Sequence, residues 1–111
     1  MKLMEYQAQQ LFEKFCVPVK AGCVIDNVES ITPAMKKKNM RYPIVVKAQI
    51  QSGHRGQAGG IQFAGDYEEA RRHADNLLGR ELLGLKVNKL YLVEKASIKI
   101  EWYLSIMLDR L

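Results

Sequence analysis

A chain of 111 residues that is 48% hydrophobic and 26% charged has the composition of one ordinary globular domain, which excludes a disordered tail. Two cysteines are too few for a disulfide framework, and no CxxC spacing indicates zinc. No stretch approaches the roughly 20 apolar residues of a membrane span, and no signal peptide is visible. We expect no membrane partner and a reduced cytosolic compartment, or the mitochondrial matrix if the protein is eukaryotic and processed.

The net charge is +5, from 17 Lys and Arg against 12 Asp and Glu. Such a surplus favours a polyanionic partner, either a nucleotide or a nucleic acid. Surplus lysine on a solvated face explains the charge equally well, because net charge alone says little about the fold.

The amino-terminal region predicts an amphipathic helix over residues 4–15. Its apolar residues recur with the 3.6-residue period of one helix face: Met4, Ala8, Leu11, Phe12 and Phe15. Pro18 prevents the helix from continuing. A short strand is expected next, over residues 22–25.

Residues 28–38 have helical spacing but contain Pro33. With Thr32 as N-cap and Pro33 at the first helical position, a short helix would begin late in this segment. Residues 44–50 are β-branched and nearly continuously apolar, which predicts a strand buried on both faces.

A loop is expected over residues 51–60, because four glycines in eight positions are incompatible with a regular element. We expect this loop to be poorly ordered without a ligand. Strand-like alternation resumes over residues 61–63.

The clearest helix begins after Asp66, a good N-cap, and ends before Gly79, a natural C′ residue. Its buried stripe is predicted to contain Ala70, Ala74, Leu77 and Leu78. Two further strands are expected over residues 90–94 and 102–108.

This order of elements predicts an α/β (α+β) fold, a mostly antiparallel sheet with helix 66–78 packed against it. Strands 44–48 and 90–94 are expected in that one sheet. Because the chain stops directly after an apolar strand candidate, we expect a fragment of a larger domain.

The chemistry-bearing segment combines Lys47, on a buried strand, with the glycine loop that carries Arg55. A lysine in that position needs water or an anion for its ammonium group, and backbone N–H groups of a glycine-rich loop can approach phosphate oxygens closely. The pair therefore indicates phosphate binding. The alternatives are that Lys47 only reaches solvent from a strand end, and that the loop is a plain connection.

Known phosphate motifs fail here. The P-loop lacks its Lys-Ser or Lys-Thr, GxGxxG is absent, and a protein kinase has its glycine loop before the strand lysine. Gly53-His54-Arg55-Gly56 does match the GxxG of KH domains, which clamp RNA. We keep a KH-like RNA-binding module as the alternative, although a KH loop joins two helices.

Three blocks of sequence resemble the β subunits of succinyl-CoA synthetases. Residues 4–12, MEYQAQQLF, are similar to their HEYQAKQLF. The run VVKAQ at 45–49, followed by GHRGQAGG at 53–60, resembles VVKAQxxxGGRGKAGG. The third block begins with LVE at 92–94, which is identical to the LVE of the family. It continues with EWYLS at 101–105, which is similar to KELYLS, and with DR at 109–110, which matches DR. Malate–CoA ligases and ATP-citrate lyases share parts of these blocks.

The resemblance implies an ATP-grasp ligase that activates a carboxylic acid through an acyl phosphate. It implies ATP or GTP as nucleotide, an α subunit and the remainder of the ATP-grasp domain as partners, and no nucleic acid. Lys47 would contact the nucleotide phosphates, and Gly53, His54, Arg55 and Gly56 would cover them. Glu94 and Glu101 would contact the adenine and ribose end.

Within this family, residues 1–20 would be a leading helix, 21–100 the smaller nucleotide-binding subdomain, and 101–111 the first strand of the next subdomain. The sequence departs from the family at two loop positions. His54 stands where the family has a glycine, and Gln57 stands where the family has a lysine. We assign no catalytic residue and no metal ligand to this chain. The ligands of Mg²⁺ would lie beyond it, so the isolated chain is expected to be inactive.

Overall fold

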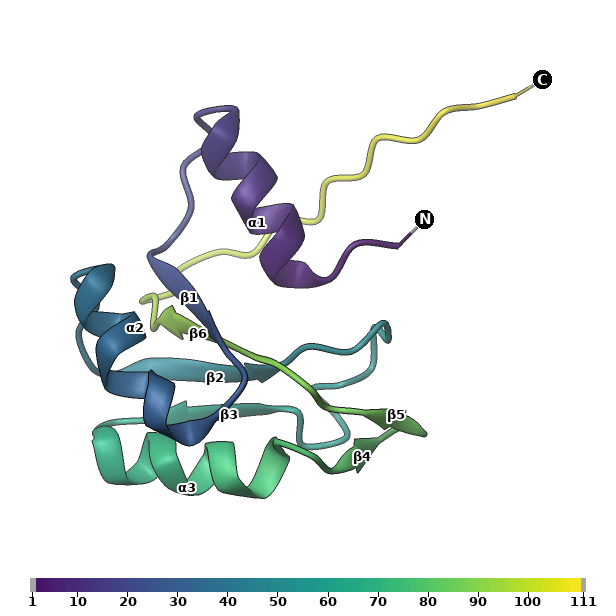
Figure 1. Cartoon of the computed structure of the whole chain (residues 1–111). Coiled ribbons are helices and arrows are strands. Elements are labelled where there is room, and N and C mark those ends of the chain that lie inside the picture. Colours follow the sequence, from purple (N-terminus) through teal and green to yellow (C-terminus); the bar gives the residue numbers. More distant parts are fainter. Residues whose placement is uncertain (1, 111) are drawn as a thin grey trace.

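The computed structural model describes residues 2–110, and its centre is a four-stranded antiparallel sheet with the strand order β1-β6-β2-β3 (Figure 1). The strands are β1 (Gly22–Ile25), β2 (Ile44–Ala48), β3 (Ile61–Ala64) and β6 (Leu90–Glu94). The expected antiparallel sheet that contains strands 44–48 and 90–94 is therefore confirmed. Those two strands are direct neighbours, with Lys47 opposite Tyr91.

The hydrophobic core lies between one face of the sheet and two helices, α2 (Ile31–Lys37) and α3 (Tyr67–Leu77). The core face of β2 is fully buried through Ile44, Val46 and Ala48. Helix α3 packs on it through Ala70, Ala74 and Leu77, as the apolar stripe predicts. The small alanines let the helix approach the sheet closely.

Both ends of α3 follow the sequence signals. Oδ1 of Asp66 accepts a hydrogen bond from the backbone N–H of Glu69 at 2.9 Å, which satisfies one of the helix's unpaired donors. Gly79 follows the last turn with φ of +76°, the left-handed conformation for which glycine is suited.

The prediction that β2 is buried on both faces is wrong. Its side chains alternate, so Val45 and Lys47 are only partly buried on the second face. Helix α1 (Glu5–Lys14) lies over part of that face, on the opposite side of the sheet from α3 (Figure 1). The strand can tolerate a lysine because this second face stays accessible.

Helix α1 is confirmed, but its apolar face is not buried against the described residues. The helix contains no buried residue, and Phe12 and Phe15 are 46% and 73% exposed. Its first turn is capped by Gln7, whose Oε1 accepts from the backbone N–H of Met4 at 2.9 Å. Polar contacts therefore carry more of its attachment than apolar packing does.

The predicted start of the second helix is wrong. A 3₁₀ turn, η1 (Val28–Ser30), precedes α2, and Ser30 rather than Thr32 is the N-cap. Pro33 is the third helical residue. It is tolerated there because the N–H groups of the first helical turn have no intrahelical partner.

A small hairpin, β4 (Glu81–Leu82) and β5 (Leu85–Lys86), is not anticipated by the sequence. Its turn residues Leu83 and Gly84 both have positive φ, 53° and 75°. This pattern is that of a type I′ turn.

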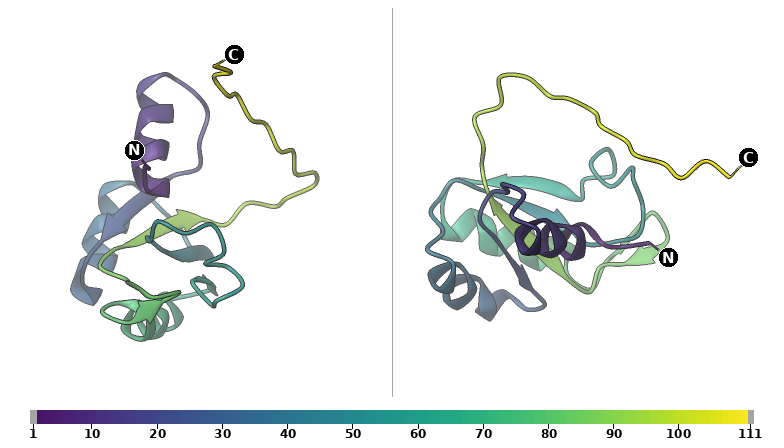
Figure 2. Two further views of the ribbon diagram at one scale, coloured as in Figure 1. Left: turned by 90° about the vertical axis from the view of Figure 1, so that its right-hand side faces the viewer. Right: turned by 90° about the horizontal axis from the view of Figure 1, so that it is seen from above.

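The predicted strand over residues 102–108 is wrong for the described chain. No strand forms within residues 95–110, and Trp102 and Tyr103 are 87% and 93% exposed. Figure 2 shows this segment running away from the sheet. A strand needs a neighbour for its N–H and C=O groups, and within residues 2–110 this segment has none. Its assignment to a following subdomain stays a prediction, and Leu111 lies outside the described residues.

None of the helices described between residues 2 and 110 has the length and apolar character needed to cross a bilayer.

Candidate functional site

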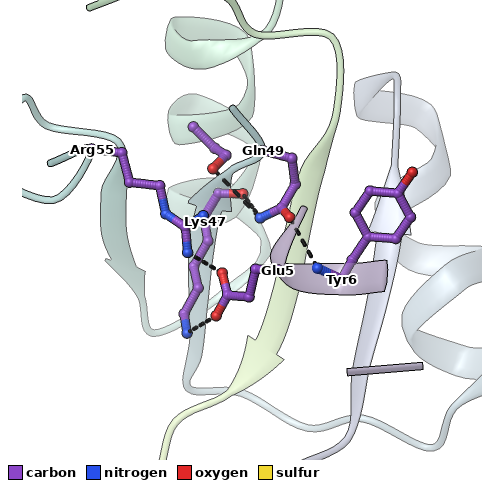
Figure 3. Close-up of polar contacts among 6 residues, drawn as sticks. Glu5, Tyr6, Lys47, Gln49 and Arg55 are labelled. Atoms are coloured by element: carbon purple, nitrogen blue, oxygen red, sulfur yellow. Dashed lines mark hydrogen bonds and ion pairs between the residues drawn. The ribbon is translucent and has the colours of Figure 1, made fainter. Parts of the chain in front are cut away.

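Lys47 and Arg55 meet at one point above the second face of the sheet (Figure 3). Nζ of Lys47 donates to Oε1 of Glu5 at 2.8 Å, and Nη2 of Arg55 donates to Oε2 of the same carboxylate. The three side chains are only 16–24% exposed. Strand β2 fixes the lysine, and the glycine loop brings the arginine back over it.

The carboxylate of Glu5 is ionised in this arrangement. Its burial alone would raise its pKa, but the hydrogen bond and charge of Lys47, together with the charge of Arg55, outweigh burial. The pKa of Glu5 therefore lies below its ordinary value of 4.5. Two cations and one anion leave the cluster with a charge of +1, which suits a polyanionic ligand.

Gln49 ties the start of α1 to the end of β2. It is 1% exposed, and its Oε1 accepts from the backbone N–H of Tyr6 at 3.1 Å. Its Nε2 donates to the backbone oxygen of Lys47 at 3.2 Å. A buried amide with both ends satisfied fixes local geometry, so Gln49 holds Glu5 and Lys47 in register.

The glycine loop closes onto β2 at Gly60. The backbone N–H of Gly60 donates to the oxygen of Arg55 at 2.7 Å, and its own oxygen accepts from Ala48 N–H at 2.7 Å. Gly53, at the opposite side of the loop, has no atom within 4 Å of the position of a Cβ. Its backbone is therefore open to close approach by a ligand.

Two hollows flank the Glu5 carboxylate. One, of about 410 Å³, lies between α1 and the sheet and is lined by Lys47, Lys20 and Glu94 among others. The other, of about 430 Å³, lies beside the loop and is lined by Gly53, Ser52 and Arg55 among others. Glu5 is the one described residue that lines both.

The remaining predicted site residues are dispersed. Glu94 lines the first hollow, and its Oε1 accepts from the backbone N–H of Arg41 at 3.0 Å. His54 and Gly56 are exposed in the loop, and Glu101 is exposed in the extended segment after β6. The structure therefore brings Lys47 and Arg55 together, and Glu101 lines neither of the two hollows beside them.

A larger depression of about 740 Å³ lies near α2 and the start of α3, lined by Met35, Met40, Tyr42 and Tyr67 among others. No candidate phosphate-binding residue lines it. Within residues 2–110 no group of three or more His, Cys, Asp and Glu side chains could hold a metal ion.

The KH-like alternative is not supported. Gly53-His54-Arg55-Gly56 joins two antiparallel strands, β2 and β3, whereas a KH loop joins two helices.

Sequence reasoning missed Glu5 and Gln49 as parts of this cluster. Glu5 is 42 residues from Lys47 in the chain, so no local spacing links them. The usable signal is a single glutamine, Gln49, at the end of an apolar strand, where a buried amide must find partners.

Comparison with known proteins identifies the family of this chain. The sequence matches the ATP-grasp domain family over residues 2–111. The chain belongs to the ATP-grasp family. It is similar to the β subunit of the ADP-forming succinate–CoA ligase of Desulfotalea psychrophila, with 41% identity over 117 aligned residues. The alignment covers 99% of this ATP-grasp chain and 30% of the relative's length.

Proposed function

We propose that this ATP-grasp chain is the nucleotide-phosphate-binding part of an ATP-dependent acid–CoA ligase, of the succinate–CoA ligase (ADP-forming) type. The convergence of Lys47 and Arg55 on a single carboxylate carries the proposal. Two cations held at one point, beside an open glycine backbone, suit the oxygens of a polyphosphate.

In the proposed site, Lys47 is a fixed point charge and Arg55 offers a fork of donors from the loop. Gly53, His54 and Gly56 would add backbone N–H groups over the phosphates. The first hollow leads from Lys47 towards Glu94, so the ribose and base end of the nucleotide would lie there, with Glu101 contributing from the segment after β6.

In the proposed reaction the γ-phosphoryl group of ATP is transferred to a carboxylic acid and ADP is released. The thiol of CoA then attacks the acyl phosphate, forming a thioester and releasing inorganic phosphate. Such transfers depend on positioning and on stabilising charge. Lys47 and Arg55 would supply both at the phosphates. We assign no Mg²⁺ ligand to Glu94 or Glu101, which we place at the other end of the nucleotide, and we place the Mg²⁺ ligands in the remainder of the ATP-grasp domain.

The assignment of ATP and of succinate follows the name of the relative, an ADP-forming succinate–CoA ligase subunit β. The same name is the basis for proposing an α subunit as partner. Because this chain spans 30% of the relative's length, we propose that the remainder of an ATP-grasp domain completes the cleft.

The binding part of the proposal is tested by titrating the ¹⁵N-labelled chain with ATP while its amide NMR signals are recorded. We expect weak binding, with shifts centred on residues 47–60. Lys47→Ala should abolish these shifts. Lys86→Ala removes the same charge from the exposed strand β5 and should leave them unchanged. If ATP shifted the signals of residues 47–60 equally in Lys47→Ala and Lys86→Ala, the assignment would be refuted.

The catalytic part is tested by acid- and CoA-dependent ADP release from a β subunit that contains this region, assembled with its α subunit. We expect Lys47→Ala to reduce turnover severely, because no other cation on β2 can replace it. Gln57→Ala should matter little. A Lys47→Ala enzyme as fast as wild type would contradict the assigned role.

A further inference from the structure

Glu5 lies between Lys47 and Arg55, the two cations to which the proposed function assigns the nucleotide phosphates. Each of its two carboxylate oxygens accepts from one of the two cations, Lys47 and Arg55. A carboxylate and a phosphoryl group present similar pairs of anionic oxygens to lysine and arginine. While Glu5 stays in place, the donors that face it are already satisfied.

Glu5 also separates the two hollows. The first is lined by Lys47 and the second by Gly53 and Arg55, and Glu5 is the one described residue common to both. If its side chain moved away, a continuous groove would run from β2 to the open backbone of the glycine loop. A polyphosphate chain is elongated and needs such a groove.

The attachment of α1 is weak enough to permit this movement. No residue of α1 is buried, and its first turn is held chiefly by polar contacts (Figure 3). These are the Glu5 pairs, the bond from Tyr6 N–H to Gln49, and the ammonium group of Lys89 at 5.7 Å from the Tyr6 ring centroid. Regions with few buried apolar contacts open locally at a low cost in free energy.

We infer that Glu5 is the resident anion of the phosphate site: it holds Lys47 and Arg55 together when no nucleotide is bound, and nucleotide phosphates displace it. Displacement frees the first turn of α1 and joins the two hollows. This inference rests on the proposed function. The contrasting arrangement, in which Glu5 stays bound and only orients the cations, predicts that the first turn of α1 does not respond when phosphate binds.

The test uses inorganic pyrophosphate, which has the phosphate chemistry without the nucleoside. The full chain is ¹⁵N-labelled and titrated, and amide shifts are recorded for wild type, Glu5→Gln and Glu13→Gln. Glu13 is the matched control because it also lies on α1 and pairs only loosely, with Lys38 at 4.0 Å. Both variants remove one negative charge from the same helix.

Glu5→Gln should bind pyrophosphate roughly fivefold tighter than wild type, the factor expected for removing a unit charge about 4 Å away in water. Glu13→Gln should bind within about twofold of wild type, because its charge is more distant and screened. Unchanged or weaker binding by Glu5→Gln would overturn the inference.

A second readout needs no variant. In the wild-type chain the Tyr6 amide should shift at the same pyrophosphate concentrations as Gly53 and Gly56. The reason is that Tyr6 N–H loses its hydrogen bond to Oε1 of Gln49 when the first turn of α1 is freed. A stationary Tyr6 signal with shifting loop signals would overturn displacement. A titration with ATP separates failure of this inference from failure of the proposed function. If ATP caused no amide shifts in residues 47–60, the proposed function itself would be refuted.

Discussion

Gly60 packs directly against Leu82. A Cβ on Gly60 would lie 2.6 Å from Cδ2 of Leu82 and 2.9 Å from the backbone oxygen of Arg55. The first neighbour is the end of a side chain, but the second is backbone and cannot move without disturbing the loop.

We therefore expect Gly60→Ala to destabilise the fold by about 1–3 kcal/mol, the usual cost of overpacking. Gly53→Ala is the matched control, since a Cβ there meets nothing within 4 Å, and its stability should be unchanged within about 0.5 kcal/mol. Urea unfolding followed by circular dichroism measures both. Equal stabilities of the two variants would contradict the packing of Gly60.

The ion pairs of Glu5 make part of the stability dependent on pH. The pKa of Glu5 is lowered in the folded state, so its contribution is fully present above the ordinary value of 4.5 and is lost as pH falls through the folded pKa. At pH 7, Glu5→Gln should lower the free energy of unfolding by about 1 kcal/mol, because the pairs are still partly exposed.

The same difference between wild type and Glu5→Gln should shrink as the pH is lowered well below 4.5. Urea unfolding at pH 7 and at the lowest pH at which the fold persists gives the two values. A difference that grew on acidification would mean that the folded-state pKa is raised rather than lowered.

Leu83 is strained in the turn of the small hairpin. Its φ of 53° is unfavourable for a leucine, and half of the residue (51%) is exposed. Leu83→Asn creates Asn-Gly, the preferred type I′ pair, and should stabilise the protein by about 0.5–1 kcal/mol.

Thermal unfolding measures the effect of Leu83→Asn. Leu85→Asn controls for the loss of an exposed leucine, because Leu85 is 40% exposed in β5 and has no positive φ. A gain in Leu85→Asn as large as that in Leu83→Asn would show that reduced surface hydrophobicity, not turn geometry, is responsible.

The two cysteines should differ sharply in reactivity. Burial raises the pKa of Cys23 to about 11, so at pH 8 only about a thousandth of it is thiolate, the reactive form. Cys16 is exposed. We expect a chromogenic disulfide reagent to modify one thiol rapidly and the second only on unfolding. Cys16→Ser should remove the fast phase, and Cys23→Ser should keep it.

The sequence predicted those elements whose signals are local. Residues 22–25 and 61–63 were recognised from short apolar runs, and α3 from Asp66 and Gly79 at its ends. The hairpin at 81–86 was missed because its strands have two residues each and a leucine stands where a turn usually has Asn or Gly. Residues 102–108 have strand composition, but composition cannot supply a partner strand.

The site was also predictable only where its residues lie close together in the sequence. Lys47 and the loop arginine follow from one continuous segment, whereas Glu5 enters from α1 and was not assigned. Contacts between distant parts of the chain depend on how α1 lies across the sheet, which the periodicity of α1 does not specify. Its exposed phenylalanines show how little apolar packing determines that placement.

The strand order has a consequence for how the protein is made. Strand β6, the last strand among residues 2–110, lies between β1 and β2, so Gly22 pairs with Val93 and Ala48 with Leu90. During synthesis, residues 2–89 are made before the strand that joins the sheet, and β1 has no partner strand among these residues. Such long-range pairing slows folding. We expect the nascent chain to gain protease resistance abruptly once residues 90–94 have emerged, and earlier stalling to leave it sensitive.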